Sequence, residues 1–310
     1  MNLKRCLLFL FVIATTSQLA IAQSGEWNSA NEDEALDQYT LLGKPLPNEI
    51  PTPSFSDSFS RLPKDWTLFK RMVVDKRNRH HIYQLGYITG ALLATDHETW
   101  SALKRSNDKE DSIESINEHF VGLGDGFFQM AVAGVFGAVG YIAEDNLAKR
   151  TSFQIVEVFL ATGSVAHLMK HVTGRQSPSR ATSRTGNWEP LPDQNRYYED
   201  VKAYGSFPSA NLATFYASFK VIEDNYRHHT WLPYLRYFLT TGVVLGNTGQ
   251  SKHWLSEAPI SIAIGHVFAK IVTRNNHPDN RLEMQKYETI KIVPMFSPKG
   301  DSLVGVQWAW

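Results

Sequence analysis

The sequence is almost free of cysteine and has no excess of charge of either sign. Its 310 residues include one cysteine, Cys6, with 31 basic and 31 acidic side chains. A protein that neutralises nucleic-acid phosphates needs a basic excess, so nucleic acid is not an expected partner. Hydrophobic residues make up 43% of the chain and charged residues 20%, a balance that excludes a wholly disordered chain.

The first 22 residues have the pattern of a secretory signal peptide. Lys4 and Arg5 precede an apolar run over 7–14, and Ala20-Ile21-Ala22 fits a cleavage site. The apolar run is short for an uncleaved membrane anchor. We therefore expect a signal peptide over 1–22 and an exported protein, either periplasmic or membrane-associated. Cleavage of the signal peptide would also remove Cys6. The mature chain would then have no disulfide, no thiolate metal site and no cysteine nucleophile.

Other common cofactor and metal patterns are also missing. The sequence contains no Walker loop, no dinucleotide glycine pattern and no His-Glu-x-x-His. The histidine pairs at 80–81 and 228–229 are adjacent in sequence, so their members do not share a helix face. We expect no metal site and no cofactor.

Apolar spacing divides the chain into three regions after the signal peptide. Residues 23–77 are rich in Ser, Pro, Asn and acidic residues, which predicts an irregular N-terminal extension. Residues 78–275 contain helical apolar patterns at 81–95, 126–143, 151–172, 209–225, 232–246 and 254–274. These patterns predict an all-α bundle of about six core helices. Residues 276–310 form a tail in which 290–296 and 303–310 predict a short C-terminal β-hairpin.

The sequence does not decide whether this bundle is surrounded by water or by lipid. The run at 126–143 has no formal charge and is long enough to cross a bilayer. The other runs contain Lys220, Arg236, His266 and Lys270, and charges inside a membrane span are costly. We therefore favour a soluble bundle, with a six-span membrane protein as the alternative.

Three separated segments contain groups that suit an oxyanion. Lys170 and Arg175 lie at a helix end that enters a long loop over 173–206. Ser209 opens the next helix, whose first amides make an anion site. His253 precedes Glu257 by four residues, so a carboxylate could orient an imidazole nucleophile.

These segments resemble the type 2 phosphatidic acid phosphatase / vanadium haloperoxidase superfamily. Its pattern is Lys-x6-Arg-Pro, then Pro-Ser-Gly-His, then Ser-Arg-x5-His-x3-Asp, and the order and spacing agree over about 78–275. The resemblance implies that Lys170, Ser209 and the nearby backbone at Ala210 bind phosphate. It also implies that His253 forms a phosphohistidine and that Glu257 replaces the Asp that orients it.

The departures from this pattern concern the acid and the cations. Asn211 stands in place of the histidine that protonates the leaving group, and an amide has no useful acidic proton. Ser177 and Asn247 stand in place of the two motif arginines, with Arg175 as a candidate replacement for phosphate binding. The pattern thus resembles that of a degenerate bacterial member of the superfamily, and two hypotheses about function remain. One is a weakened phosphohydrolase acting on a phosphate monoester or a lipid (pyro)phosphate, and the other is an inert pseudoenzyme that binds an anion or lipid phosphate.

Overall fold

The computed structural model describes residues 53–275, 289–296 and 302–309 of the chain. Its elements, in chain order, are α3 (Asp57–Ser60), α4 (Leu62–Val74), η1 (Lys76–Asn78), α5 (Arg79–Leu93), α6 (Asp96–Asn107), α7 (Asp111–Leu123), α8 (Gly126–Ile142), α9 (Asn146–Thr173), η2 (Pro178–Arg180), α10 (Gln194–Glu199), α11 (Val201–Tyr204), α12 (Ala210–Asn225), α13 (Leu232–Gly249), η3 (Leu255–Glu257), α14 (Ala258–Asn275), β1 (Thr289–Phe296) and β2 (Ser302–Ala309).

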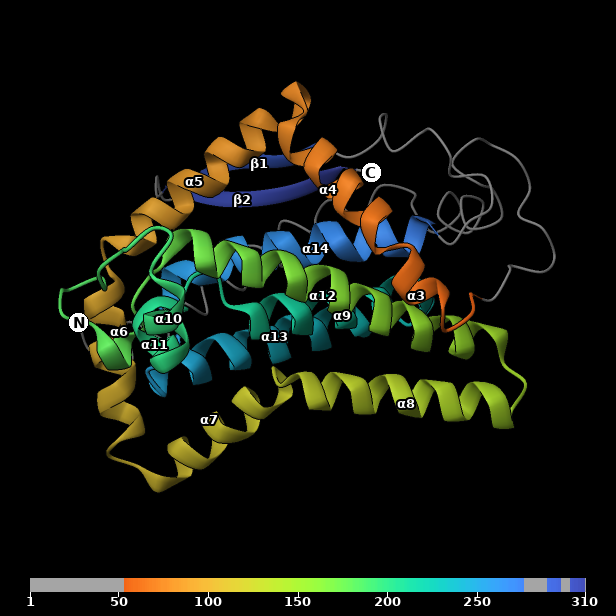
Figure 1. The fold of residues 1–310 in the computed structure, drawn as a ribbon, viewed down its shortest axis with the longest axis horizontal. Coiled ribbons are helices and arrows are strands. Elements are labelled where there is room, and N and C mark those ends of the chain that lie inside the picture. Colours follow the sequence, from red (N-terminus) through yellow and green to blue (C-terminus); the bar gives the residue numbers. More distant parts are fainter. Residues whose placement is uncertain (1–52, 276–288, 297–301, 310) are drawn as a thin grey trace.

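Helices α9, α12 and α14 form the centre of the bundle (Figure 1). They bury a shared apolar core that includes Ile155, Val158, Val221, Phe268 and Ile271. Helices α12 and α14 approach closely at Gly265, where an added Cβ would lie 2.4 Å from the carbonyl oxygen of Ala213. Packing of these apolar faces, more than helix propensity, stabilises the bundle.

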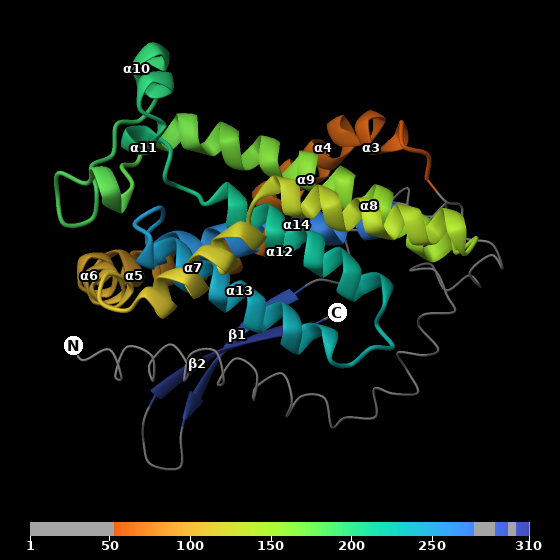
Figure 2. The same cartoon turned by 90° about the horizontal axis from the view of Figure 1, so that it is seen from below.

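The remaining long helices surround this centre. Helix α8 packs along α9, and α13 packs on α6, α7 and α12 (Figures 1 and 2). Asp125 and Asp145 begin α8 and α9 by accepting hydrogen bonds from the first backbone amides of each helix. Gly174 ends α9 in the left-handed conformation at φ 57°, where an added Cβ would collide with the carbonyl of Glu189. The chain then enters the loop that holds Arg175.

The predicted helical bundle is confirmed, and the region around it is more helical than expected. Helices α3 and α4 occupy residues that the sequence analysis assigned to an irregular extension, and they pack on α9 and α14. The apolar residues Leu62, Leu68, Phe69 and Met72 of α4 contact the core, which explains why this segment folds. Their spacing supports one apolar helix face, a signal that the surrounding Ser and Pro residues obscure. The domain boundary at 77/78 stays a prediction, and residues 1–52 lie outside the described part of the chain.

The predicted fold class must be corrected at its C-terminal β-hairpin. The continuous body over 53–275 contains no strand, so the bundle itself is all-α and the hairpin is not a supported part of the fold class. Strands β1 and β2 pair with each other and follow residues 276–288, which lie outside the described part of the chain. The physical reason is that alternating apolar residues are a local signal, and an isolated two-stranded ribbon has little stability in water.

The charges inside the apolar runs meet one another in the bundle. Lys220 contacts Glu223 and Asp224 at 2.5 and 2.9 Å, Arg236 contacts Glu223 at 2.5 Å, and Lys270 contacts Asp224 at 3.1 Å. All of these side chains are largely buried between α12, α13 and α14. Pairing reduces the cost of burying each charge, whatever surrounds the bundle.

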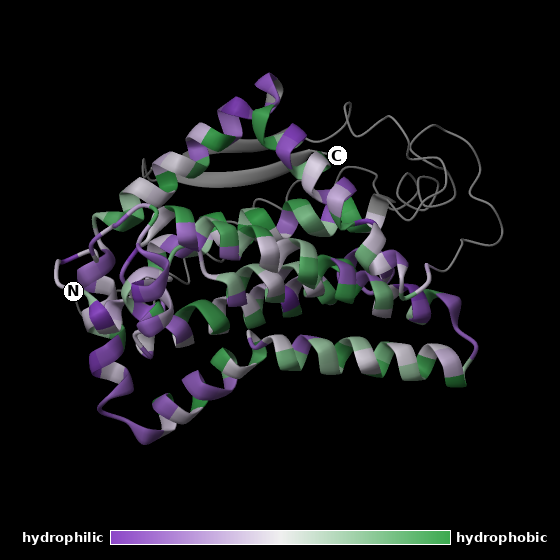
Figure 3. Ribbon diagram, in the orientation of Figure 1, coloured by the Kyte–Doolittle hydropathy of each residue, from purple (hydrophilic) through white to green (hydrophobic). Residues whose placement is uncertain are grey.

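Within the described part of the chain, two helices are long and apolar enough to cross a membrane by length and composition. They are Asn146–Thr173 and Leu255–Thr273, and the bent pair α7–α8 would make a third if it counts as one span. The outward face of α8 is apolar along its length, with Phe127 and Ile142 more than four-fifths exposed. Figure 3 shows most of this helix in the colours of apolar and weakly polar residues.

Candidate functional site

His253 and Glu257 form a hydrogen-bonded pair where the chain passes from α13 to α14. The Nδ1 atom of His253 lies 2.7 Å from Oε2 of Glu257. The carbonyl oxygen of Asn247 accepts the backbone N–H groups of Lys252 and His253, which fixes the turn before the imidazole. Among the described residues Nε2 of His253 has no hydrogen-bond partner, and the side chain is 12% exposed. The ring is therefore oriented, with one nitrogen left to attack an electrophile.

Glu257 is completely buried and has partners on both carboxylate oxygens. Ser206 donates its hydroxyl to Oε1 at 2.6 Å, and Arg175 donates to the same atom at 3.3 Å. Burial alone raises the pKa of Glu257, but His253, Arg175 and Ser206 together hold that pKa below its ordinary value. Glu257 is therefore ionised at neutral pH and can stabilise a positive charge on His253.

Arg175 lies beside this pair, and all five of its N–H groups have acceptors. Nε donates to the carbonyl of Thr185, and the two terminal nitrogens donate to Ser256, Glu257, Asp96 and again Thr185. Its guanidinium carbon also lies over the indole rings of Trp188 and Trp254, at 4.9 and 5.2 Å from their centroids. The side chain is fully buried. These contacts do not support the predicted phosphate-binding role of Arg175.

Ser209 and Ala210 begin α12 close to His253. The Ser209 hydroxyl accepts from the amide of Leu212, and the Ser209 amide donates to the hydroxyl of Ser261 at 3.0 Å. Ala210 is buried in the first turn, where helix amides lack intrahelical partners. The helix therefore presents its positive end at the position where the resemblance places a phosphate.

Lys170 lies in the last turn of α9 and is buried. Among the described residues its ammonium makes no hydrogen bond or ion pair. Burial lowers the pKa of Lys170, and the nearby charge of Glu257 opposes that effect. Lys170 is thus a desolvated cation whose pKa responds to the charge of Glu257, and its anion-binding role stays a prediction.

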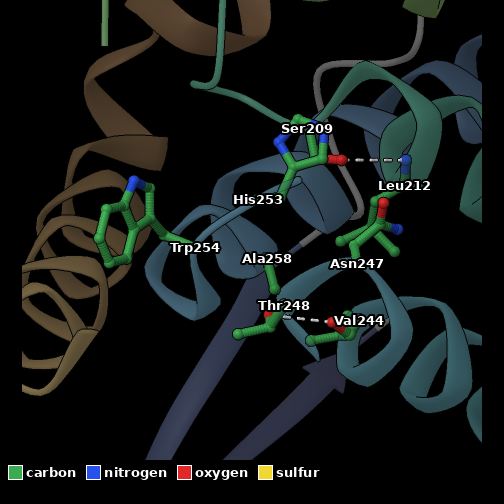
Figure 4. Close-up of a pocket in the computed structure, with 8 residues that line it drawn as sticks. All are labelled: Ser209, Leu212, Val244, Asn247, Thr248, His253, Trp254 and Ala258. Carbon is green, nitrogen blue, oxygen red and sulfur yellow. Dashed lines mark hydrogen bonds between the residues drawn. The ribbon is translucent and has the colours of Figure 1, made fainter. Parts of the chain in front are cut away.

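A small cavity joins these elements (Figure 4). It is lined by Ser209, Leu212, Val244, Asn247, Thr248, His253, Trp254 and Ala258. Its volume is about 10 Å³, which is room for about one water molecule. Asn247, in place of the motif arginine, donates its amide to the Val243 carbonyl of its own helix, so it adds no cation here. A phosphate needs this cavity to open.

Asn211 turns away from the cavity. Its exposed side chain lines a separate hollow of about 360 Å³, together with Glu118, Val121, Gly122, Asp125, Gln250 and Lys252. The structure thus brings together Lys170, Arg175, Ser209, Ala210, His253 and Glu257, but it places the Asn211 side chain on the neighbouring surface. His171 does not take its place, because its ring packs on Tyr197 at 4.1 Å between centroids.

Sequence reasoning gave no role to four buried residues that hold the His253–Glu257 pair and its neighbours in place. They are Asp96, Ser206, Ser256 and Ser261; all are buried, and none occupies a fixed position of the family pattern. Asp96 follows the apolar α5 helix at the start of α6, where an acidic residue also suits a helix N-terminus, so the local pattern does not reveal its partner. Among the described residues no group of three or more His, Cys, Asp and Glu side chains could hold a metal ion.

One comparison with known proteins finds a match that covers most of the site. The family described as the PAP2 superfamily matches residues 152–281, a segment that contains Lys170, Ser209, His253 and Glu257. No curated protein and no solved structure matches the chain. The resemblance predicted from the three motifs is confirmed, and a phosphatase-type function follows at the level of the superfamily. Over residues 152–281, the part that contains the motifs, this chain is similar to the PAP2 superfamily.

Proposed function

We propose that the protein is a phosphohydrolase of weakened activity that uses His253 as its nucleophile. The observation that carries this proposal is the 2.7 Å contact between His253 Nδ1 and Glu257 Oε2, which leaves Nε2 directed by a buried, ionised carboxylate. Nothing else in the described part of the chain combines an oriented imidazole with a nearby helix N-terminus and a buried lysine.

The reaction would proceed in two displacements. Nε2 attacks phosphorus, a P–N bond forms, and the P–O bond to the alcohol breaks. Lys170 and the first amides of α12 stabilise the negative phosphate oxygens. Water then attacks the phosphohistidine, the P–N bond breaks, and inorganic phosphate leaves. Glu257 stabilises the positive charge that His253 acquires in the first step.

The expected weakness comes from the acid and the cations. The leaving alcohol must take a proton, and Asn211 cannot supply one, which costs about 10²–10⁴ in rate. A missing transition-state donor costs about 10²–10³ more. Substrates with an acidic leaving group avoid the first loss, so they should react fastest.

A second candidate is an inert module that binds a phosphorylated small molecule or a lipid phosphate. Two observations favour it: the cavity beside His253 holds about one water, and Arg175 has no donor left for an anion. Both candidates share the same binding groups, so they differ in turnover and not in ligand chemistry. The oligomeric state is open in both.

We further propose that the protein is exported and works at a membrane face. The apolar outward face of α8 offers a surface for the lipid boundary, including Phe127, Val135, Val139 and Ile142. Co-sedimentation with phospholipid vesicles tests this, with Val135→Asp and Val139→Asp as weakened variants. A chain that stays in the supernatant in both forms would contradict the proposal.

The first experiment is phosphate release from p-nitrophenyl phosphate by the purified protein and by His253→Ala. His228→Ala is a matched control, because His228 lies at the far end of α12, in the connection to α13. Turnover that is lost in His253→Ala and kept in His228→Ala supports the nucleophile. Turnover equal in all three, or absent from the wild type, contradicts the phosphohydrolase and leaves the binding module.

A further inference from the structure

Asp96 is a buried carboxylate that no motif contains. It lies at the start of α6 and is 1% exposed. Its Oδ2 atom accepts from an Arg175 terminal nitrogen at 2.7 Å and from the Ser256 hydroxyl at 2.6 Å. Its Oδ1 atom accepts from the Ser256 backbone amide at 3.1 Å. Asp96 therefore holds both Arg175 and the residue next to Glu257.

Two routes lead from Asp96 to His253. In the first, Arg175 joins Asp96 to Glu257, and Glu257 joins His253. In the second, Asp96 fixes the amide of Ser256, which sets the position of Glu257 in η3. Both routes end on the carboxylate that orients the imidazole. Since the three charged side chains of this network are fully buried, water cannot replace any contact that is removed.

We propose that Asp96 and Arg175 are positioning residues that hold Glu257 against His253, and that Arg175 does not bind the substrate phosphate. The effect of this clamp on turnover rests on the proposed phosphohydrolase function. The clamp itself does not, because it is a statement about the geometry of the Glu257–His253 pair.

The geometry of Arg175 requires an arginine. Its fork reaches Asp96, Glu257, Ser256 and the Thr185 carbonyl at once, and a lysine offers one nitrogen at one point. A phosphate ligand at this position would retain part of its affinity as lysine, because an ammonium also binds phosphate. Arg175→Lys therefore separates the two roles.

The test uses Asp96→Asn and Arg175→Lys in the full chain, with Glu223→Gln as the control. Glu223 is a largely buried carboxylate that pairs with Arg236 and Lys220 in the other ion cluster. With p-nitrophenyl phosphate, both test variants should lose about 10- to 100-fold in kcat through misorientation. The inhibition constant of inorganic phosphate should stay within about twofold, since no phosphate contact is removed. A weaker phosphate inhibition in Arg175→Lys with unchanged kcat would overturn the proposal.

A second readout does not need turnover. In protein labelled with ¹⁵N-histidine, nitrogen shifts show which ring nitrogen of His253 is protonated, with His253→Ala giving the assignment. Neutral His253 should be protonated at Nδ1 in the wild type and in Glu223→Gln, and should show both tautomers in Asp96→Asn. A single unchanged tautomer in Asp96→Asn would contradict the clamp, whether or not the protein hydrolyses phosphate.

A milder variant keeps the test decisive if Asp96→Asn does not fold. Ser256→Ala removes the hydroxyl that donates to Asp96 and accepts from Arg175 at 2.9 Å, and it leaves every charge in place. The same tautomer mixing is expected, to a smaller extent. A wild-type tautomer and wild-type kcat in Ser256→Ala would count against the clamp.

Discussion

Arg175→Met should destabilise the folded protein strongly, because the substitution leaves two buried carboxylates without their shared cation. Arg175, Asp96 and Glu257 all have fully buried side chains, joined at 2.7 and 3.3 Å. Removing one partner of such a buried pair costs about 3–5 kcal/mol. For a domain of roughly 200 residues, each kcal/mol shifts Tm by about 2–4 °C, so Tm should fall by about 6–20 °C.

The measurement is thermal unfolding followed by far-ultraviolet circular dichroism, with Arg180→Met as the control. Arg180 pairs with Asp200 at 2.8 Å, but these side chains are 55% and 38% exposed. A surface pair of this kind contributes about 0–1 kcal/mol, so the control should move Tm by about 4 °C at most. Equal shifts in the two variants would refute the conclusion that the Arg175 network is closed to water.

Three further predictions concern the site. Lys170→Met should raise Tm, because burial lowers the pKa of Lys170 and its charged form is costly in the folded state, and it should weaken stabilisation by added phosphate; a lowered Tm would instead favour a helix-dipole role. Asn211→His should leave turnover of alkyl phosphates and of p-nitrophenyl phosphate nearly unchanged, because position 211 lines the neighbouring hollow and not the cavity beside His253; a gain of about 10²–10⁴ with alkyl phosphates alone would show that position 211 reaches the leaving group. Burial raises the pKa of Glu257, but the opposing effects of His253 and Arg175 are larger, so the pKa lies below the ordinary 4.5. The contribution of ionised Glu257 to stability is therefore complete above about pH 4.5, the ordinary pKa, and it is lost as the pH falls through the lowered pKa of the folded protein. The difference in unfolding free energy between the wild type and Glu257→Gln should shrink below about pH 4.5, and urea unfolding across that range measures it.

The bundle could be predicted because its signals are local. Helix α12 begins at a capping serine and shows continuous apolar spacing, and the structure begins it at the same place. The hairpin was wrong because a pattern of alternating residues says nothing about what a ribbon packs against. Helix α4 was missed because one short apolar face is a weak signal among prolines and serines. Its core contacts with α9 and α14 appear only in three dimensions.

The site divides in the same way. His253 and Glu257 are four residues apart near the start of α14, so their contact could be predicted from spacing alone. Arg175 lies 79 residues from Asp96, and only the fold shows that this carboxylate takes up its donors. Asn211 lies on the exposed side of the first turn of α12, which explains why its side chain lines the neighbouring hollow. Ser209 caps the same turn from the buried side. Motif order therefore indicates the proposed nucleophile, and long-range contacts show which partners surround each remaining residue.

The position of Asp96 also has a consequence for how this protein can be divided. The segment recognised by the superfamily begins at residue 152, and a fragment cut there would lack Asp96 and the whole of α8. Such a fragment would bury the Arg175 guanidinium with one of its two counter-charges missing, and it would uncover the side of α9 that α8 now protects. The segment that matches the superfamily is thus shorter than the segment that we expect to fold independently. A stable fragment has to begin before α6.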